Sequence, residues 1–162
     1  MMRLFSLVVA FVLCVTLPAG SVRAQESFPL NFDLPTATAK INLTQLSGKV
    51  VYVDFWASWC APCLQSFPFM NELQSKYGDK GLRIVAISVD KERADVDTFL
   101  RKNPAQFIIA FDPAGQIAKQ YQIKGMPTSY LIGRNGQLIK IHRGFKNTDR
   151  EQIERSIQEA LK

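Results

Sequence analysis

The decapeptide Asp54-Phe55-Trp56-Ala57-Ser58-Trp59-Cys60-Ala61-Pro62-Cys63 decides the fold of this chain of 162 residues. The run before it, residues 49–53, is apolar and β-branched, which is typical of a strand covered on both faces. After it, the apolar residues recur at spacings of three and four, as on one face of a helix; they are Leu64, Phe67, Met70, Leu73 and Tyr77, and Gly78 suits the helix end. The pattern therefore predicts two cysteines on the first turn of a helix that follows a buried strand.

This position has a chemical consequence for the two cysteines. The unpaired N–H groups and the positive end of the helix dipole favour an anion there. The thiolate is the form of cysteine that attacks disulfides, so we expect Cys60 to have a lowered pKa and to be the nucleophile. Cys63 is placed to attack the resulting mixed disulfide and release the partner. Pro62 suits the first turn because it has no N–H to leave unpaired.

Three other interpretations of the pair are a structural disulfide, half of a zinc site and two inert thiols in the core. Zinc needs about four ligands, and the chain offers no second cysteine pair and only His142 as a histidine. A bridge across two intervening residues closes too small a loop to restrain the unfolded chain much. The sequence therefore favours a redox-active dithiol.

Two segments resemble known motifs of one superfamily. The decapeptide, with Pro68 five residues after the second cysteine, resembles the active-site segment of the thioredoxin superfamily. Residues 124–132 resemble its cis-proline loop and the strand after it, so Pro127 is expected to be cis and to face the cysteines. The additional length between the two motifs, together with a secretion signal, resembles the TlpA/ResA branch.

The resemblance implies an α/β fold, a thioredoxin-like three-layer sandwich. Its central mixed sheet would be flanked by helices, with an inserted strand–helix unit near residues 82–102. Alternating apolar residues over 28–34 and a short run at 41–43 would form an N-terminal β extension. The resemblance implies no cofactor.

The rest of the chain reads as alternating strands and helices, which indicates right-handed crossovers and a parallel sheet. We expect strands at 82–89 and 107–111, a helix at 94–102, and a short helix that Asp112 caps and Pro113 opens. A hairpin at 128–133 and 137–143 would turn at Asn135-Gly136, a dipeptide favoured in type I′ turns, and a helix would end the chain. In the second strand of the hairpin, Ile139 and Ile141 would face the core, and His142 would be solvated.

The first residues predict export from the cytoplasm. Arg3 precedes an almost wholly apolar run at 4–17, and small residues follow at 22–24, where a signal peptidase would cut. We expect cleavage after Ala24, which leaves one thioredoxin-like domain at 25–162 in the periplasm. The apolar run is shorter than the ~20 residues of a membrane span; an uncleaved signal that anchors the protein is the alternative.

Composition excludes several classes of protein. Cleavage would lower the net charge from +6 to +4, because Arg3 and Arg23 are lost, and no basic run indicates a nucleic-acid partner. It would also leave only Cys60 and Cys63, so the mature chain is not a disulfide scaffold. We expect a monomer.

Asp54 is the candidate proton acceptor. A carboxylate in so apolar a strand should have a raised pKa, so it could take the proton of Cys63 directly or through water. It also coincides with the buried acid of classical thioredoxins; the alternative is that it caps a local backbone group. ResA-like proteins usually carry a glutamate three residues after the second cysteine, where this chain has Ser66.

Four residues would form the substrate-binding surface. The resemblance places Pro127 so that the backbone of Met126 can pair with an extended partner segment. Trp59 and Met126 would supply apolar contact around the sulfurs, and Pro62 lies between the cysteines. We assign Trp56 to the core instead.

The dipeptide Ala61-Pro62 is close to the Gly-Pro of thioredoxin and lacks the histidine of strongly oxidising relatives. It therefore favours a reductase of protein disulfides that receives electrons from a membrane thiol donor, such as a DsbD/CcdA-like protein. Cytochrome c maturation is one implied pathway. The alternatives are an oxidant of exported proteins and a Cu(I)-binding module that uses the same cysteines.

Overall fold

The structure is a computed structural model that describes residues 31–162. Its central sheet contains β3 (Val50–Trp56), β4 (Leu82–Ser88), β5 (Ile108–Phe111), β6 (Thr128–Ile132) and β7 (Leu138–Arg143). The strand order is β5-β4-β3-β6-β7. Strands β3, β4 and β5 are parallel, whereas β6 and β7 run antiparallel to their neighbours.

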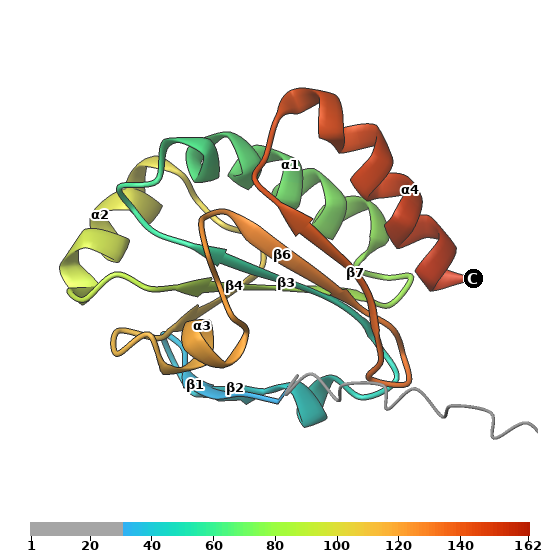
Figure 1. Ribbon diagram of the computed structural model, residues 1–162, viewed down its shortest axis with the longest axis horizontal. Coiled ribbons are helices and arrows are strands. Elements are labelled where there is room, and N and C mark those ends of the chain that lie inside the picture. Colours follow the sequence, from blue (N-terminus) through green and yellow to red (C-terminus); the bar gives the residue numbers. More distant parts are fainter. Residues whose placement is uncertain (1–30) are drawn as a thin grey trace, which may run out of the picture.

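Helices cover both faces of this sheet. They are α1 (Ala61–Tyr77), α2 (Arg93–Lys102), α3 (Gln116–Gln120) and α4 (Arg150–Leu161), the last preceded by the 3₁₀ turn η2 (Asn147–Asp149). Figure 1 shows α1, α2 and α4 above the sheet and α3 below it. The three-layer, thioredoxin-like α/β sandwich predicted from the sequence is confirmed.

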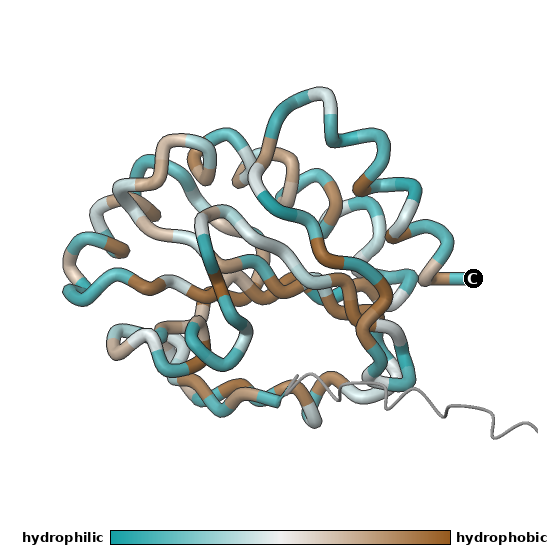
Figure 2. Tube along the Cα trace, viewed as in Figure 1, coloured by the Kyte–Doolittle hydropathy of each residue, from teal (hydrophilic) through white to brown (hydrophobic). Residues whose placement is uncertain are grey.

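Strand β3 is the centre of both cores, and all of its residues are buried. Because side chains alternate along a strand, Val51 and Phe55 pack toward α3, whereas Tyr52 and Trp56 pack toward α1. Figure 2 shows the hydrophobic residues concentrated along the middle of the sheet. The same alternation places the buried Asp54 on the α1 side.

An aromatic cluster fixes α1 on the sheet close to the cysteines. The ring of Phe67 lies 4.6 Å from that of Trp56, 4.9 Å from that of Phe99 and 5.4 Å from that of Phe107, measured between centroids. These rings come from β3, α1, α2 and the segment before β5. The cluster therefore joins the start of α1 to three other parts of the fold.

The N-terminal β extension is present as β1 (Asp33–Pro35) and β2 (Lys40–Asn42), which pair antiparallel. Phe32, Leu34 and Ile41 are buried against the α3 side of the sheet. Part of the strand predicted at 28–34 lies outside the described residues. β2 ends at Asn42, not at Leu43, because the Asn42 side chain accepts from the Gln45 N–H and caps the 3₁₀ turn η1 (Leu43–Leu46).

The hairpin forms as predicted, but the type I′ turn and the core position of Ile139 are wrong. Asn135 does not have the positive φ that a type I′ turn requires, whereas Gly136 has a φ of +77°. The register shifts beside Ile132, which pairs with Leu138 while the preceding residue pairs with Lys140. Ile139 is therefore an extra residue in the strand, and it is 51% exposed.

The short helix after β5 begins later than predicted. α3 starts at Gln116, not at Pro113. The carboxylate of Asp112 nevertheless caps it, since it accepts hydrogen bonds from the backbone N–H groups of Gln116 (2.9 Å) and Ala118 (2.8 Å). Three residues, 113–115, thus separate the cap from the helix, and they form a turn.

Phe67→Ala should lower the free energy of unfolding by ~3–5 kcal/mol, because it leaves a cavity among the three remaining rings. Leu64→Ala is the matched control on the same helix. Leu64 was predicted on the buried face but is 47% exposed, so its loss should cost less than about 1 kcal/mol. Urea unfolding of the oxidised proteins measures both, and equal losses would contradict this packing.

Candidate active site

The two cysteines lie where the chain leaves β3 and enters α1. Cys60 is the N-cap residue of α1, and Cys63 lies in its first turn, as predicted. The two form a disulfide, with their Cα atoms 5.3 Å apart. The backbone N–H of Cys63 donates a hydrogen bond to the Sγ of Cys60 at 3.3 Å. The sulfur of Cys60 thus occupies the anion-favouring position at the helix N-terminus.

The two sulfurs differ in access. Cys63 is fully buried, whereas Cys60 is 6% exposed and lies next to Trp59, which is 70% exposed. A partner that approaches from solvent therefore meets Cys60 first. Ser66, at the position where ResA-like proteins carry glutamate, is buried, and its hydroxyl donates to the Cys63 carbonyl at 3.0 Å.

An unforeseen carboxylate holds the loop that precedes Cys60. The Asp90 side chain accepts hydrogen bonds from the backbone N–H (2.9 Å) and the hydroxyl (2.7 Å) of Ser58. It also accepts one from the Ser88 hydroxyl at 2.8 Å. The sequence signal for this contact was an acid just after a predicted parallel strand. The carboxyl ends of β3 and β4 lie side by side, so an acid after β4 lies close to the loop after β3.

Asp54 is 1% exposed, and its carboxyl group has one partner. The Ser129 hydroxyl donates to its Oδ1 at 2.6 Å, whereas its buried Oδ2 has no hydrogen-bond partner among the described residues. Burial raises the pKa of Asp54 to about 7, and the bond from Ser129 opposes part of that rise. Asp54 can therefore exchange a proton near neutral pH, from the face of β3 that packs against α1.

His142 is not the solvated residue predicted from the sequence. It pairs across the strands with Ser129, which itself pairs with Asp54, and its side chain is only 18% exposed. The β7 side chains on this face are covered by α4; the Lys140 ammonium donates to the Ser156 hydroxyl at 3.2 Å. The imidazole Nε2 of His142 lies 3.6 Å from the Asp149 carboxylate. The alternation of residues in the strand does not predict that α4 packs on this face.

Two grooves meet at Cys60, one on each side of Trp59. The larger, the α3 groove, has a volume of about 760 Å³; besides Trp59, Cys60 and Pro62 it is lined by Val89, Ala118, Lys119, Ile123, Lys124 and Met126. The smaller, the α2 groove, has about 470 Å³ and is lined by Leu64, Asp95, Thr98, Phe99 and Lys102 as well as Trp59 and Cys60. The reactive sulfur is thus reached along two surface depressions.

Three of the predicted binding residues, Trp59, Pro62 and Met126, line the α3 groove with Cys60. Pro127 is buried, and the Met126–Pro127 peptide bond is cis, as predicted. The Pro127 carbonyl accepts from the Gly144 N–H at 2.8 Å. Within residues 31–162, the backbone of Met126 forms no hydrogen bond, so it is available to a partner.

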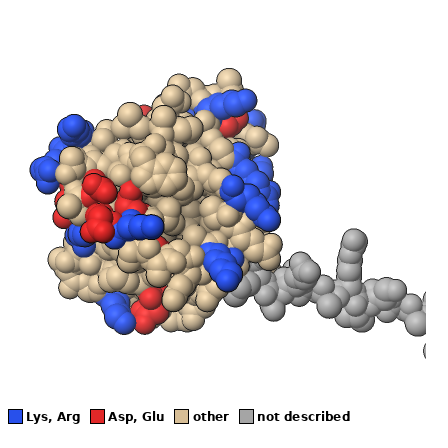
Figure 3. All heavy atoms as spheres, turned by 60° about the vertical axis from the view of Figure 1, so that its left-hand side comes forward, with Lys and Arg blue, Asp and Glu red and all other residues tan. Residues whose placement is uncertain are grey.

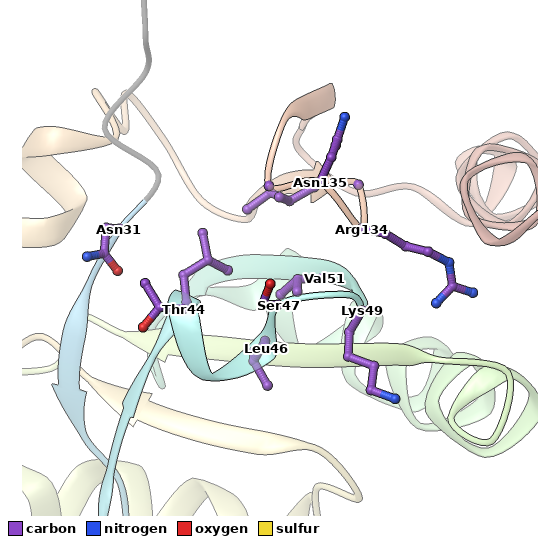
Figure 4. Close-up of a pocket in the computed structure, with 12 residues that line it drawn as sticks. Asn31, Thr44, Leu46, Ser47, Lys49, Val51, Arg134 and Asn135 are labelled. Atoms are coloured by element: carbon purple, nitrogen blue, oxygen red, sulfur yellow. The ribbon is translucent and has the colours of Figure 1, made fainter.

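A further cavity, of about 360 Å³, lies at the opposite end of β3 (Figure 4). Its lining includes Asn31, Thr44, Ser47 and Val51. Figure 4 shows the side chains of Lys49 and Arg134 extending away from the middle of this group. β3 has seven residues, so roughly 20 Å separates this cavity from the cysteines. It takes no part in the cysteine chemistry.

Comparison with known proteins agrees with this geometry. The Redoxin family model matches residues 17–158. The thiol-disulfide oxidoreductase ResA of Bacillus thuringiensis subsp. konkukian is 32% identical over 169 residues, which cover 98% of this chain and 94% of the relative. A Bacillus cereus ResA is 33% identical over 153 residues, covering 91% and 85%.

A solved structure is also similar. It is described as a thiol:disulfide interchange protein DsbE from Chlorobium tepidum, and it has 49% sequence identity and a TM-score of 0.80. The match covers 82% of this chain and 94% of that one.

Asp54→Asn should flatten the dependence of stability on pH. Asp54 loses its proton near pH 4 when unfolded but near pH 7 when folded, so folding takes up a proton between these values. The folded protein is therefore destabilised as the pH rises through this window, by about 4 kcal/mol at about 1.4 kcal/mol per pKa unit. Urea unfolding of the oxidised protein from pH 4 to 8 measures this loss, which Asp54→Asn should remove.

Ser129→Ala is the matched control, because it keeps the carboxyl group but removes its hydrogen-bond donor. The pKa of Asp54 should then rise further, so that the loss of stability extends to higher pH. If all three proteins show parallel pH profiles, Asp54 does not titrate in this range.

Proposed function

The chain belongs to the redoxin family and is a thiol–disulfide oxidoreductase, and we propose that it reduces protein disulfides outside the cytoplasm. Cys60 attacks and Cys63 resolves. One observation carries this assignment: Cys60, the more accessible of the two cysteines, has the sulfur that accepts a hydrogen bond from the Cys63 N–H at the start of α1. That position stabilises a thiolate.

The reaction is a two-step transfer of two electrons. The Cys60 thiolate attacks one sulfur of the target disulfide, which breaks that bond, forms a mixed disulfide and releases the other target sulfur as a thiolate. Cys63 then loses its proton and attacks the Sγ of Cys60. The Cys60–Cys63 disulfide forms, the second target sulfur leaves as a thiolate, and the target has been reduced.

In this proposal Asp54 accepts the proton of Cys63. Its support is the burial of Asp54, its place on the α1 side of β3, and a pKa near the working pH. The unpartnered Oδ2 is the atom that would hold the proton, directly or through a water molecule.

The target segment is proposed to bind along Met126, with its backbone pairing to that residue as an added strand. The free backbone groups of Met126 and the common groove that it forms with Cys60 support this. Trp59 and Pro62 supply apolar contact, and Pro127 holds Met126 in place.

Export is proposed from the N-terminal sequence, whose predicted signal and cleavage after Ala24 lie outside the described residues. Among residues 31–162, no helix is long and apolar enough to cross a membrane. A dithiol outside the cytoplasm needs a source of electrons, so we propose a membrane thiol donor of the DsbD/CcdA kind. Cytochrome c maturation is one pathway such a reductase could serve.

Cys63→Ser should trap target proteins as mixed disulfides, because the first step still occurs and the second cannot. Cys60→Ser should trap very few, since the remaining thiol is buried. Non-reducing gels of each reduced variant, mixed with a disulfide-containing protein, compare the two. Equal trapping by both variants would contradict the roles assigned to the cysteines.

A further inference from the structure

The two grooves at Cys60 differ in charge, and this difference bears on which targets the enzyme prefers. The residues that line the α3 groove include two cations, Lys119 and Lys124, and no acid. Those of the α2 groove include one acid and one base, Asp95 and Lys102. A target segment thus meets a basic depression on only one side of Trp59. Figure 3 shows charged side chains in separate clusters on an otherwise uncharged surface.

Resting on the proposed function, we propose that the α3 groove binds target segments with an acidic side chain beside an apolar one, next to the reacting disulfide. The apolar part would be met by Val89, Ile123 and Met126. The acid would lie between Lys119 and Lys124. The occupant is therefore an acidic, partly apolar stretch of a target protein.

Both ammonium groups are free to bind an acid. Lys119 and Lys124 are exposed, and neither takes part in an ion pair or a side-chain hydrogen bond within residues 31–162. Three carboxylates lie within three residues of this lining in the sequence. Glu92 is exposed and does not line the groove, and the other two are occupied. Asp90 accepts from Ser58, and Asp112 caps α3.

The backbone that carries the two lysines is fixed by a tight turn. Gln122 has a left-handed φ of 54°, and its N–H donates to the Lys119 carbonyl at 3.0 Å. The N–H of Ile123 donates to the Ala118 carbonyl at 2.9 Å. The turn brings the chain back so that Lys124 lines the same groove as Lys119. The two charges are therefore presented together, and not on independent mobile segments.

The groove is continuous with the site of reaction. Cys60 and the unpaired backbone of Met126 belong to the same lining. An extended segment paired to Met126 would place its neighbouring side chains into the groove. Exposed ion pairs are weak, so we expect a preference of roughly 3- to 10-fold that declines with salt.

The test uses three disulfide-linked peptides that differ only in the residue beside the reacting cysteine: Glu, Gln or Lys. The reduced full chain should reduce the Glu peptide roughly 3- to 10-fold faster than the Lys peptide at low salt, with the Gln peptide between them. In about 0.5 M salt, where the Debye length is well below the ~10 Å of 0.1 M salt, the two charges are screened and the ratio should approach one. Stopped-flow fluorescence of the protein measures the rates.

Variants locate the preference. In Lys119→Gln/Lys124→Gln, the Glu-to-Lys ratio should fall to about one, whereas Lys102→Gln, which changes the other groove, should keep the wild-type ratio. The ratio cancels any change in the reactivity of Cys60 itself. The proposal is overturned if the double variant keeps the full ratio, or if Lys102→Gln removes it.

The same data separate this inference from the proposed function. If the wild-type protein reduces all three peptides at one rate, the acid preference is wrong and the reductase stands. If it reduces neither the peptides nor a small-molecule disulfide, the proposed reductase function is wrong. Urea unfolding curves confirm that the surface variants are folded.

Discussion

The hydrogen bond from the Cys63 N–H to the Sγ of Cys60 is the interaction on which the site depends. It exists because the chain leaves a wholly buried strand and starts a helix within a few residues, so that the helix N-terminus meets a sulfur atom. The aromatic cluster around Phe67 fixes the helix, and Asp90 fixes the loop before it. Together these contacts hold the nucleophile where solvent and a partner reach it.

A second constraint is the buried carboxyl group of Asp54. Burial of a group with an unpartnered oxygen destabilises the folded protein whenever that group is ionised. The hydroxyl of Ser129 offsets only part of this cost. A group with that property is suited to taking up and giving back a proton near neutral pH, which is what the second step of disulfide exchange requires.

Much of this arrangement followed from local sequence patterns. The cysteine spacing, the change from strand to helical period and the resemblance of residues 124–132 predicted the sheet, α1 and the cis proline. The turn of the hairpin and the start of α3 were wrong for local reasons, whereas two other errors concern features set by contacts distant in sequence. A shift in strand register exposed Ile139, and α4 covered the face of β7 that carries His142. The hydrogen bonds that Asp90 accepts from Ser58, and the position of Lys119 and Lys124 in one groove, likewise depend on tertiary structure.

The direction of electron flow is the central claim, and the reduction potential of the Cys60–Cys63 couple tests it most directly. The purified protein would be equilibrated against thiol buffers of known potential, and its oxidised fraction measured. We predict a value near that of thioredoxin, roughly −270 mV, as a disulfide reductase requires. A value near that of DsbA, roughly −120 mV, would contradict this account and make the protein an oxidant of its targets.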